Sequence, residues 1–314
     1  MLTVQQNTQI GILHGHTFPV TAIAFSPDGE TLISAGDNRI QLWNLTRGRL
    51  IRTLRGHTDN WSESAVTSLA VSPNGKFIAS GGTDKTIKIW HLQHFLRSER
   101  GKTHTLTGHS QGSLLAQGVR AVAFSADGKI LASGGSDKVI KLWDTRTWTE
   151  ISTLTGYSYA IASIAFSPVE PCLISTAGNT IKLWKLDSDE QITFAASSVP
   201  RSVCFNANGQ TFATGGLKGA FSLWALKIQE EVIKDTLHSE EIKSIAFSPN
   251  GQVFATGGYD NTIKLWDAVT GDLINTLTGH SDAVYSLAFC PDSSILASGS
   301  ADKTIRLWKV PSKF

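Results

Sequence analysis

The sequence of 314 residues contains little cysteine and almost no excess of charge of either sign. Its three cysteines, Cys172, Cys204 and Cys290, lie far apart and form no paired spacing. This pattern argues against a disulfide framework and favours a reducing compartment. Lysine and arginine number 28 and acidic residues 26, giving a formal net charge of +2. Such a balance argues against a nucleic-acid partner, which usually requires a clustered basic surface.

Long apolar stretches are also missing from the sequence. No run approaches the roughly 20 apolar residues that a membrane-spanning helix needs. The first residues, Met1 to Gln9, are polar and lack the basic start and apolar core of a signal peptide. We therefore predict a cytoplasmic protein that makes no contact with a membrane.

A recurring segment dominates what the sequence does contain. Seven times, a short stretch with alternating apolar residues ends in tryptophan, at a period of about 40 residues. Each repeat also holds an apolar strand and a turn such as Ser26–Gly29, in which proline, aspartate and glycine set the backbone angles. Short strands at even spacing, with turn signals between them, predict an all-β repeat architecture. The recurring tryptophans are Trp43, Trp90, Trp143, Trp184, Trp224, Trp266 and Trp308.

These motifs resemble the WD40 family, whose signature is Gly-His near the start of a repeat and Trp-Asp near its end. Gly-His occurs at residues 15–16, 56–57, 108–109 and 279–280, and strict Trp-Asp at 143–144 and 266–267. The resemblance covers nearly the whole chain. It implies a seven-bladed β-propeller of four-stranded antiparallel blades. We expect residues 1–314 to form a single propeller domain of seven repeats.

Closure of the ring can be predicted from the two chain ends. The segment Asp272–His280 supplies an outer strand before a Gly-His pair, and Asn7–His16 has the same pattern with no repeat before it. The last repeat stops soon after Trp308 and has no room for an outer strand of its own. We therefore predict that the N-terminal strand completes the last blade, which would protect an open sheet edge from aggregation.

Histidine, serine or threonine, aspartate and tryptophan recur together and superficially suggest a hydrolase. A hydrolase needs one catalytic triad beside an oxyanion hole, whereas this set occurs five times. In the WD40 family such sets resemble an internal hydrogen-bond chain that rigidifies a turn, so we expect a structural role. The sets are His16, Ser34, Asp37 and Trp43, shortened by one residue; His57, Ser80, Asp84 and Trp90; His109, Ser133, Asp137 and Trp143; His238, Thr256, Asp260 and Trp266; and His280, Ser298, Asp302 and Trp308.

Two repeats depart from this pattern. In the fourth, Tyr157 replaces the histidine and the turn Ala177–Asn179 has no aspartate. In the fifth, Ala196 and Lys218 stand at the histidine and aspartate positions. We expect both blades to be locally weaker or packed by other means. Drift in a redundant array and relaxation around a partner site are the two explanations.

Binding residues are expected where the repeats differ, because shared positions build the common frame. Two long loops follow His57 and His109, and the family resemblance puts them on the same face. They offer Trp61, Leu114 and Leu115 as candidate partner contacts, since apolar residues in polar loops suggest a contact surface. The alternative is that the two loops bury these side chains against each other.

The mouth of the channel on that face is the second candidate site. Alignment with the family puts one side chain of each blade there, near the start of the inner strand. Cations beside aromatic rings suit an acidic or phosphorylated peptide. The alternative is an ordinary solvated rim, in which Glu240 and Glu241 dilute the charge. The candidate residues at the mouth are Arg120, Arg201, Lys243, Tyr259 and Tyr285.

We conclude that the sequence predicts a non-catalytic, monomeric scaffold that binds a protein or peptide on the top face of a propeller. The alternative is a propeller enzyme, or a regulatory sensor domain cut from a larger protein. An enzyme needs a unique cluster of ionisable residues in one cleft, and none is apparent outside the recurring sets. The histidines His91, His94 and His104 lack partners at a zinc-binding spacing, so we expect no metal and no cofactor.

Overall fold

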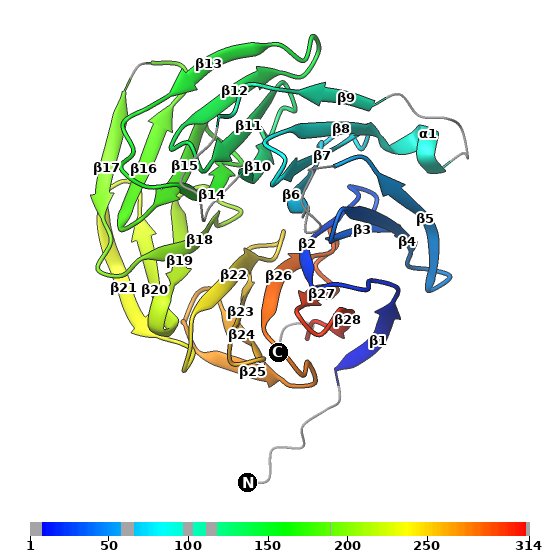
Figure 1. The fold of residues 1–314 in the computed structure, drawn as a ribbon. Coiled ribbons are helices and arrows are strands. Elements are labelled where there is room, and N and C mark those ends of the chain that lie inside the picture. The colour runs from blue at the N-terminus through cyan, green and yellow to red at the C-terminus, as the bar shows by residue number, and fades with distance from the viewer. Residues whose placement is uncertain (1–7, 58–65, 97–102, 111–117, 189, 312–314) are drawn as a thin grey trace, which may run out of the picture.

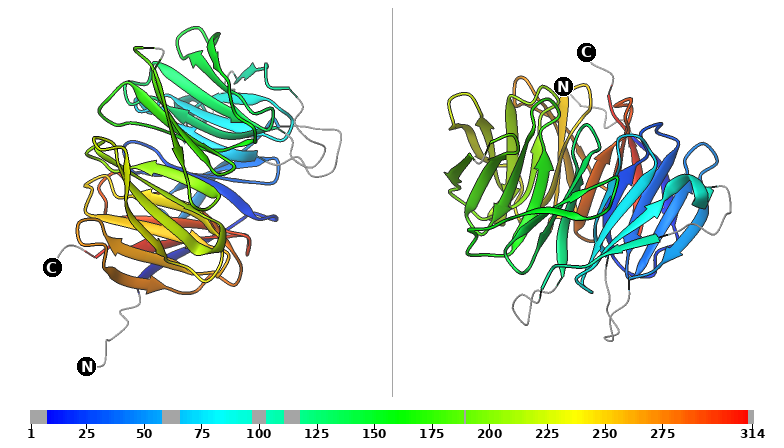
Figure 2. Two further views of the ribbon diagram at one scale, coloured as in Figure 1. Left: turned by 90° about the vertical axis from the view of Figure 1, so that its left-hand side faces the viewer. Right: turned by 90° about the horizontal axis from the view of Figure 1, so that it is seen from above.

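The computed structural model describes residues 8–57, 66–96, 103–110, 118–188 and 190–311. The described chain forms seven sheets, each of four antiparallel strands. The sheets stand around a common axis as the blades of a propeller (Figure 1). In the side views, the strands of each blade run between the two faces of the ring (Figure 2). The predicted seven-bladed, all-β architecture is confirmed.

We number the blades 1 to 7 in the order of the recurring tryptophans, from Trp43 in blade 1 to Trp308 in blade 7. The inner strands surround the axis (Figure 1) and are β2 (Val20–Phe25), β6 (Val66–Val71), β10 (Val119–Phe124), β14 (Ile161–Phe166), β18 (Pro200–Phe205), β22 (Ile242–Phe247) and β26 (Val284–Phe289). The second strands are β3 (Thr31–Gly36), β7 (Phe77–Gly82), β11 (Ile130–Gly135), β15 (Cys172–Ala177), β19 (Thr211–Gly216), β23 (Val253–Gly258) and β27 (Ile295–Ser300).

The third strands carry the tryptophans and are β4 (Arg39–Asn44), β8 (Ile87–His91), β12 (Ile140–Asp144), β16 (Thr180–Lys185), β20 (Ala220–Ala225), β24 (Ile263–Asp267) and β28 (Thr304–Lys309). The outer strands are β5 (Arg49–Arg55), β9 (Thr103–Leu106), β13 (Glu150–Leu154), β17 (Gln191–Ala195), β21 (Glu230–Thr236), β25 (Leu273–Leu277) and β1 (Gln9–His14). Two short helices interrupt this pattern, α1 (Leu92–Leu96) and the 3-10 turn η1 (Leu217–Gly219). Neither they nor any other helix of the described residues is long and apolar enough to span a bilayer.

The hydrophobic core lies between neighbouring blades. One cluster joins Ile33 and Leu42 of blade 1 to Val66, Ile78 and Trp90 of blade 2. Both faces of each sheet are therefore covered, and every residue of β3 and β23 is buried. This explains why the second strands read as continuous apolar and small residues, where a half-exposed strand would show alternation.

The two chain ends meet in blade 7. The N-terminal strand β1 pairs antiparallel with β28, and the register matches Leu13 with Ile305 and His14 with Thr304. Figure 1 shows the blue first strand beside the red last one. The backbone N–H of Lys309 extends this ladder by donating to the carbonyl of Thr8 at 2.7 Å. The predicted closure of the ring by the N-terminal strand is thus confirmed.

Candidate functional site

The recurring polar set of blade 2 forms a buried chain of hydrogen bonds. Trp90 Nε1 donates to Ser80 Oγ at 2.9 Å, and His57 Nε2 lies 2.7 Å from the same oxygen. On its other side, His57 Nδ1 lies 3.0 Å from a carboxylate oxygen of Asp84. Because the carboxylate accepts, Nδ1 carries the proton, which leaves Nε2 to accept from the serine hydroxyl. The chain thereby ties a loop, two strands and a turn together.

Blades 3, 6 and 7 repeat this geometry. The distances from histidine Nε2 to the hydroxyl are 2.8 Å for His109–Ser133, 2.7 Å for His238–Thr256 and 2.7 Å for His280–Ser298. The nearest carboxylate oxygens lie at 3.0 Å for His109–Asp137, 2.9 Å for His238–Asp260 and 2.7 Å for His280–Asp302. In all three blades the tryptophan Nε1 of Trp143, Trp266 or Trp308 donates to the same hydroxyl.

The charges in these sets are fixed by burial and hydrogen bonding. Burial lowers the pKa of His238 and His280 and outweighs their aspartate partners, so both rings are neutral at pH 7. Burial alone would raise the pKa of Asp302, but hydrogen bonds from Thr304 and His280 lower it to about 2. The imidazoles are also nearly inaccessible, with His57 only 1% exposed. The imidazole rings of these sets are therefore closed to solvent.

Blade 1 keeps only part of its expected set. His16 Nε2 lies 2.7 Å from Ser34 Oγ, and Trp43 Nε1 donates to that oxygen at 2.8 Å. Among the described residues, however, no hydrogen bond joins Asp37 to His16. The turn is one residue shorter than in blade 2, and Asp37 takes the left-handed position, with φ of 59°. The aspartate expected to complete the set thus serves as a turn residue.

The two divergent blades are packed by other means. In blade 4 the hydroxyl of Tyr157 lies 2.6 Å from Ser175 Oγ and accepts a hydrogen bond from Trp184 Nε1, also at 2.6 Å. The tyrosine thus takes the place of the histidine. In blade 5 the rings of Phe212 and Trp224 stack at 5.8 Å, and Phe194 packs edge-on against both. Trp224 Nε1 still donates to Thr214 Oγ1 at 3.2 Å, and Phe194 fills the space beside them in place of the histidine and aspartate.

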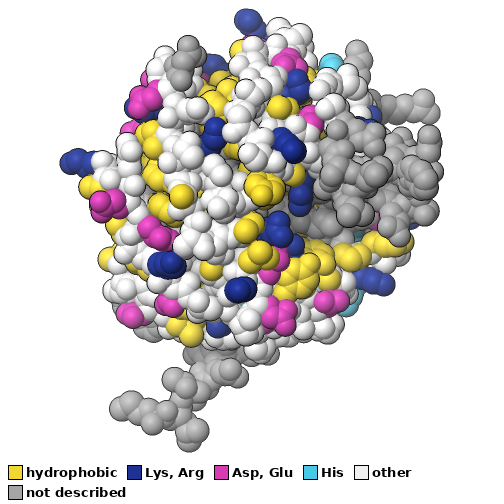
Figure 3. Space-filling view, turned by 60° about the vertical axis from the view of Figure 1, so that its left-hand side comes forward, with side chains coloured by type: hydrophobic (Ala, Val, Ile, Leu, Met, Phe, Trp, Pro, Cys, Tyr) yellow, Lys and Arg dark blue, Asp and Glu magenta, His cyan; other side chains and the backbone are white. Residues whose placement is uncertain are grey.

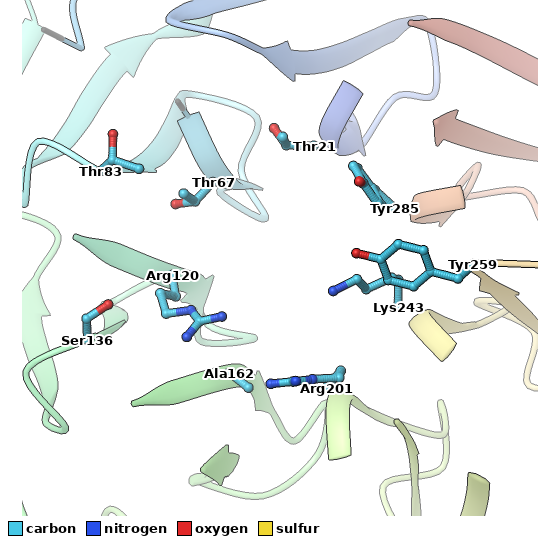
Figure 4. A pocket seen from close by; sticks show the side chains of 10 residues that line it. All are labelled: Thr21, Thr67, Thr83, Arg120, Ser136, Ala162, Arg201, Lys243, Tyr259 and Tyr285. Carbon is cyan, nitrogen blue, oxygen red and sulfur yellow. The ribbon is translucent and has the colours of Figure 1, made fainter. Parts of the chain in front are cut away.

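The five candidate residues at the channel mouth lie together. They line one cavity of about 480 Å³ at the start of the inner strands, with one residue or more from each blade (Figure 4). Figure 4 shows Arg120 across the cavity from Lys243, Tyr259 and Tyr285, with Arg201 on the side of Lys243. The remaining lining residues are Thr21, Thr67, Thr83, Ser136 and Ala162.

Two of the three cations at this mouth share one carboxylate. Glu241 Oε1 lies 3.1 Å from Arg201 Nε and 3.0 Å from Lys243 Nζ. Arg120 has no carboxylate partner in the described part of the chain, and its environment disfavours its charge. Burial, and then the positive charge of Arg201, lower the pKa of Arg120. The sequence suggested Glu241 only as a diluting charge, whereas the fold makes it the bridge between two of the cations.

The aromatic side of the mouth is joined to this charge cluster. Lys243 Nζ lies 4.9 Å from the centre of the Tyr259 ring, within range of a cation–π interaction. The rings of Tyr259 and Tyr285 meet edge to face at 6.0 Å. Burial, together with Tyr259, raises the pKa of Tyr285 to about 12. Tyr285 therefore presents a neutral hydroxyl group to the cavity.

The blades opposite the cations present threonines whose hydroxyls are already engaged. Thr21 Oγ1 donates to the carbonyl of Val66 at 2.6 Å, and Thr67 Oγ1 donates to the carbonyls of Gly81 and Val119. These bonds tie blade 1 to blade 2 and blade 2 to blade 3. The mouth is thus asymmetric, with a structural arc and an arc of cations and phenols.

Several sequence predictions fall elsewhere. Trp61, Leu114 and Leu115 lie outside the described residues. In the part of the chain that the structure does describe, no group of three or more His, Cys, Asp or Glu could hold a metal ion.

The face shown in Figure 3 intersperses basic with acidic side chains, and hydrophobic patches lie between them.

Comparison with known proteins identifies the repeats. The family model described as WD domain, G-beta repeat matches residues 7–44, 48–91, 100–144, 148–185, 231–267 and 271–309. The stretch without a match holds β18, β19 and β20, which belong to divergent blade 5. A solved structure entitled "Structure of U3-55K" superposes with a TM-score of 0.83 at 24% identity, covering 96% of this chain and 98% of that one. This likeness concerns the fold alone.

Curated relatives are longer than this chain. The chain is 27% identical over 217 residues to "Periodic tryptophan protein 2 homolog" of Dictyostelium discoideum, covering 67% of this chain and 22% of that protein. It is 31% identical over 205 residues to "Nuclear distribution protein PAC1" of Arthroderma otae, covering 57% of this chain and 42% of that protein. The matched regions thus span less than half the length of these relatives.

Proposed function

The chain belongs to the WD40 repeat family, and on that premise we propose that it is a non-catalytic scaffold that binds a partner protein through the mouth of its central channel. The observation that carries this proposal is the charge cluster at the mouth. Arg201 and Lys243 share the carboxylate of Glu241, whereas Arg120 in the same cavity has no carboxylate partner among the described residues. The three cations therefore carry more positive charge than Glu241 neutralises, and an anionic group of a partner could bind there.

The ligand we propose is an acidic or phosphorylated peptide segment. Arginine guanidinium groups form paired, planar hydrogen bonds with carboxylates and phosphates, which suits Arg120 and Arg201 to this task. A phosphorylated side chain carries close to two negative charges at pH 7 and would balance the excess. The phenols of Tyr259 and Tyr285 would pack against the peptide beside that anchor.

A non-catalytic role is supported by the burial of the histidines. A catalytic base must come within hydrogen-bond reach of its substrate. His57, His109, His238 and His280 are each less than 10% exposed, and their partners are internal. We also propose that the propeller is monomeric and works in the cytoplasm, where its three free cysteines would remain reduced.

The proposal is tested by reversing the charge of the mouth. The double variant Arg120→Glu with Lys243→Glu replaces two of the three cations with carboxylates, and should reduce the amount of partner captured from a native lysate at least tenfold. Both side chains are half-buried at the surface, so the melting temperature should stay within about 2 °C of the wild type. Affinity capture with mass spectrometry measures the first quantity, and differential scanning calorimetry the second.

The matched control is Lys227→Glu with Lys234→Glu, which makes the same change in net charge at two exposed lysines outside the mouth. This control should capture the partner as well as the wild type does. Equal capture by the mouth variant and the wild type would eliminate the channel mouth as the binding site. Loss of capture by the control alone would also contradict the proposal.

A further inference from the structure

Neighbouring inner strands are joined by recurring hydrogen bonds. At five of the seams between blades, a serine on one inner strand accepts a hydrogen bond from a backbone N–H of the next, as Ser286 does from Ile23 at 3.0 Å. At the seam from blade 1 to blade 2, Thr21 Oγ1 supplies the bond. The seam from blade 3 to blade 4 has neither, because Arg120 and Ala121 occupy the threonine and serine positions.

On the opposite face of the ring, a glycine–proline contact between neighbouring turns is made at three seams and is missing at this one, as it is at the other three. In the turn that follows the inner strand, the glycine of one blade faces the proline of the preceding blade's turn, as Gly75 faces Pro27 and Gly128 faces Pro73. At the seam from blade 3 to blade 4 both partners have changed. Ala126 stands in place of the proline and Glu170 in place of the glycine.

The blade 4 turn has a different backbone as a result. In blade 1 the turn places Gly29 at a φ of +74°, and Asp28 accepts a hydrogen bond from the N–H of Glu30 at 2.9 Å. Blade 4 has Val169 at the aspartate position, and Pro171 disfavours a helical backbone at the residue before it. The N–H of Cys172 instead donates to the carbonyl of Glu170 at 2.8 Å, which closes a tight turn around Pro171.

These changes leave a pocket of about 580 Å³ between blades 3 and 4. Its apolar lining includes Ile130, Phe166, Val169, Pro171 and Leu186. The side chain of Val169 is 63% exposed, although the equivalent position in each other blade holds aspartate or asparagine. An exposed apolar side chain at a lined pocket is typical of a contact surface.

Three carboxylates line the rim of this pocket, and two lysines lie beside them, Lys129 paired with Asp127 and Lys185 paired with Glu190, so that negative charge is in excess. Asp127, Glu170 and Asp187 line it, and only Asp127 has an ion-pair partner among the described residues, Lys129 at 3.1 Å. The field of the other two reaches the buried thiol beneath. Burial, and to a lesser extent Glu170 and Asp187, raise the pKa of Cys172. A negative rim around an apolar floor is complementary to a basic segment with an apolar side chain.

We propose that this seam pocket binds a peptide segment of a partner in which an apolar side chain is flanked by lysine or arginine. It lies at the opposite face from the channel mouth, because strand β14 carries Ala162 of the mouth near its start and Phe166 of the pocket at its end. The pocket is therefore a second site, whose charge preference is opposite to that of the mouth.

The test uses a random peptide library displayed on phage and panned against the wild-type protein. Recovered sequences should combine a large apolar residue with lysine or arginine, and the resynthesised, fluorescein-labelled peptides should bind in a fluorescence polarisation assay. Val169→Asp should weaken their binding about tenfold or more, since it puts a charge on the apolar floor. Glu170→Lys with Asp187→Lys should weaken it similarly and remove its dependence on salt.

Val169 lies in an exposed turn, although it also packs against Gly209 of blade 5, so Val169→Asp should keep the melting temperature within about 2 °C of the wild type in differential scanning calorimetry. Its matched control is Val269→Asp, at a valine that is 79% exposed in blade 6 and lies outside the pocket. The control, and the channel-mouth variant Arg120→Glu, should bind the peptides as the wild type does. Recovery of no peptide that combines apolar and basic residues, or of such peptides whose binding is indifferent to Val169→Asp, would overturn the proposal.

Discussion

The buried histidines couple the stability of the fold to pH. Burial, and then the positive charge of Arg39, lower the pKa of His16 to about 4, and in this blade no aspartate opposes the shift. In the unfolded chain the same ring titrates near 6.5. The folded state therefore holds His16 neutral at a pH where the unfolded chain already binds a proton.

We predict that the free energy of unfolding falls as the pH drops from 7 toward 4. Below about pH 6.5 His16 is protonated in the unfolded chain, whereas in the folded protein it stays neutral down to about pH 4. Protonation therefore favours the unfolded state in this pH range. His16 contributes up to about 3 kcal/mol of this loss, and His238 and His280 add to it in the same direction. Urea denaturation at pH 7 and pH 5 measures the effect.

The variant His16→Gln should lose less stability between pH 7 and pH 5 than the wild type does. The control His14→Gln, at an exposed histidine, should follow the wild-type pH dependence. An unchanged pH dependence in His16→Gln would show that this ring does not contribute to the linkage.

The sequence predicts these residues in part. Their spacing and recurrence place histidine, hydroxyl and tryptophan together, and the structure joins them at hydrogen-bond distance in blades 1, 2, 3, 6 and 7. The sequence does not predict that Asp37 makes no hydrogen bond with His16. The turn of blade 1 is one residue shorter, and this moves the aspartate to a left-handed backbone position. The ion pairs of Glu241 with Arg201 and Lys243 are also not predicted from the sequence, because they join side chains of two neighbouring blades.

At the scale of the element, the blades fill the position of the recurring histidine in different ways. Blade 4 replaces the histidine with a tyrosine that still reaches its serine and tryptophan, whereas blade 5 uses stacked aromatic rings. The sequence identifies both blades as divergent but cannot tell which replacement contacts form. The seam pocket is likewise not predicted from the sequence, because it depends on how two neighbouring blades pack. Val169 and Pro171, which replace the usual turn residues of blade 4, are the signal in the sequence that could have indicated it.

We predict that Tyr157→Phe destabilises the protein by about 1–3 kcal/mol. The change removes only the hydroxyl, and so deprives Trp184 Nε1 of its acceptor and Ser175 Oγ of a partner. Chemical denaturation measures the loss. Tyr159→Phe, at a tyrosine that is 60% exposed, is the matched control and should change stability by less than about 0.5 kcal/mol. Equal stability of the two variants would refute the structural role of Tyr157.

At the scale of the whole molecule, the ring depends on a strand from one chain end pairing with a strand from the other. The strand β1 buries Leu13 against the core of blade 7 and covers the edge of β28. The sequence predicts this closure because the outer-strand pattern appears before the first repeat and is missing after the last. The order of the blades and their number are predicted in the same way.

We predict that deleting residues 1–13 lowers the melting temperature by at least about 5 °C. The deletion exposes the edge of β28 and removes a buried leucine, which costs about 2–5 kcal/mol. A shorter deletion of residues 1–7 keeps β1 and should melt as the full chain does. Identical melting of the long deletion and the full chain would contradict closure by this strand.

The two proposed sites lie on opposite faces of the ring and carry opposite charge. The channel mouth gathers cations around one carboxylate, while the seam pocket has an acidic rim around an apolar floor. A scaffold with such faces can hold two different segments at once, because the sites lie at opposite ends of the same strand β14.

The structure of the complex with the captured partner tests the central claim most directly. We predict that a carboxylate or phosphate group of the partner lies within hydrogen-bond distance of the Arg120 guanidinium, inside the cavity that Tyr259 and Tyr285 also line. A complex in which the partner binds elsewhere and leaves Arg120 without an anion would contradict it.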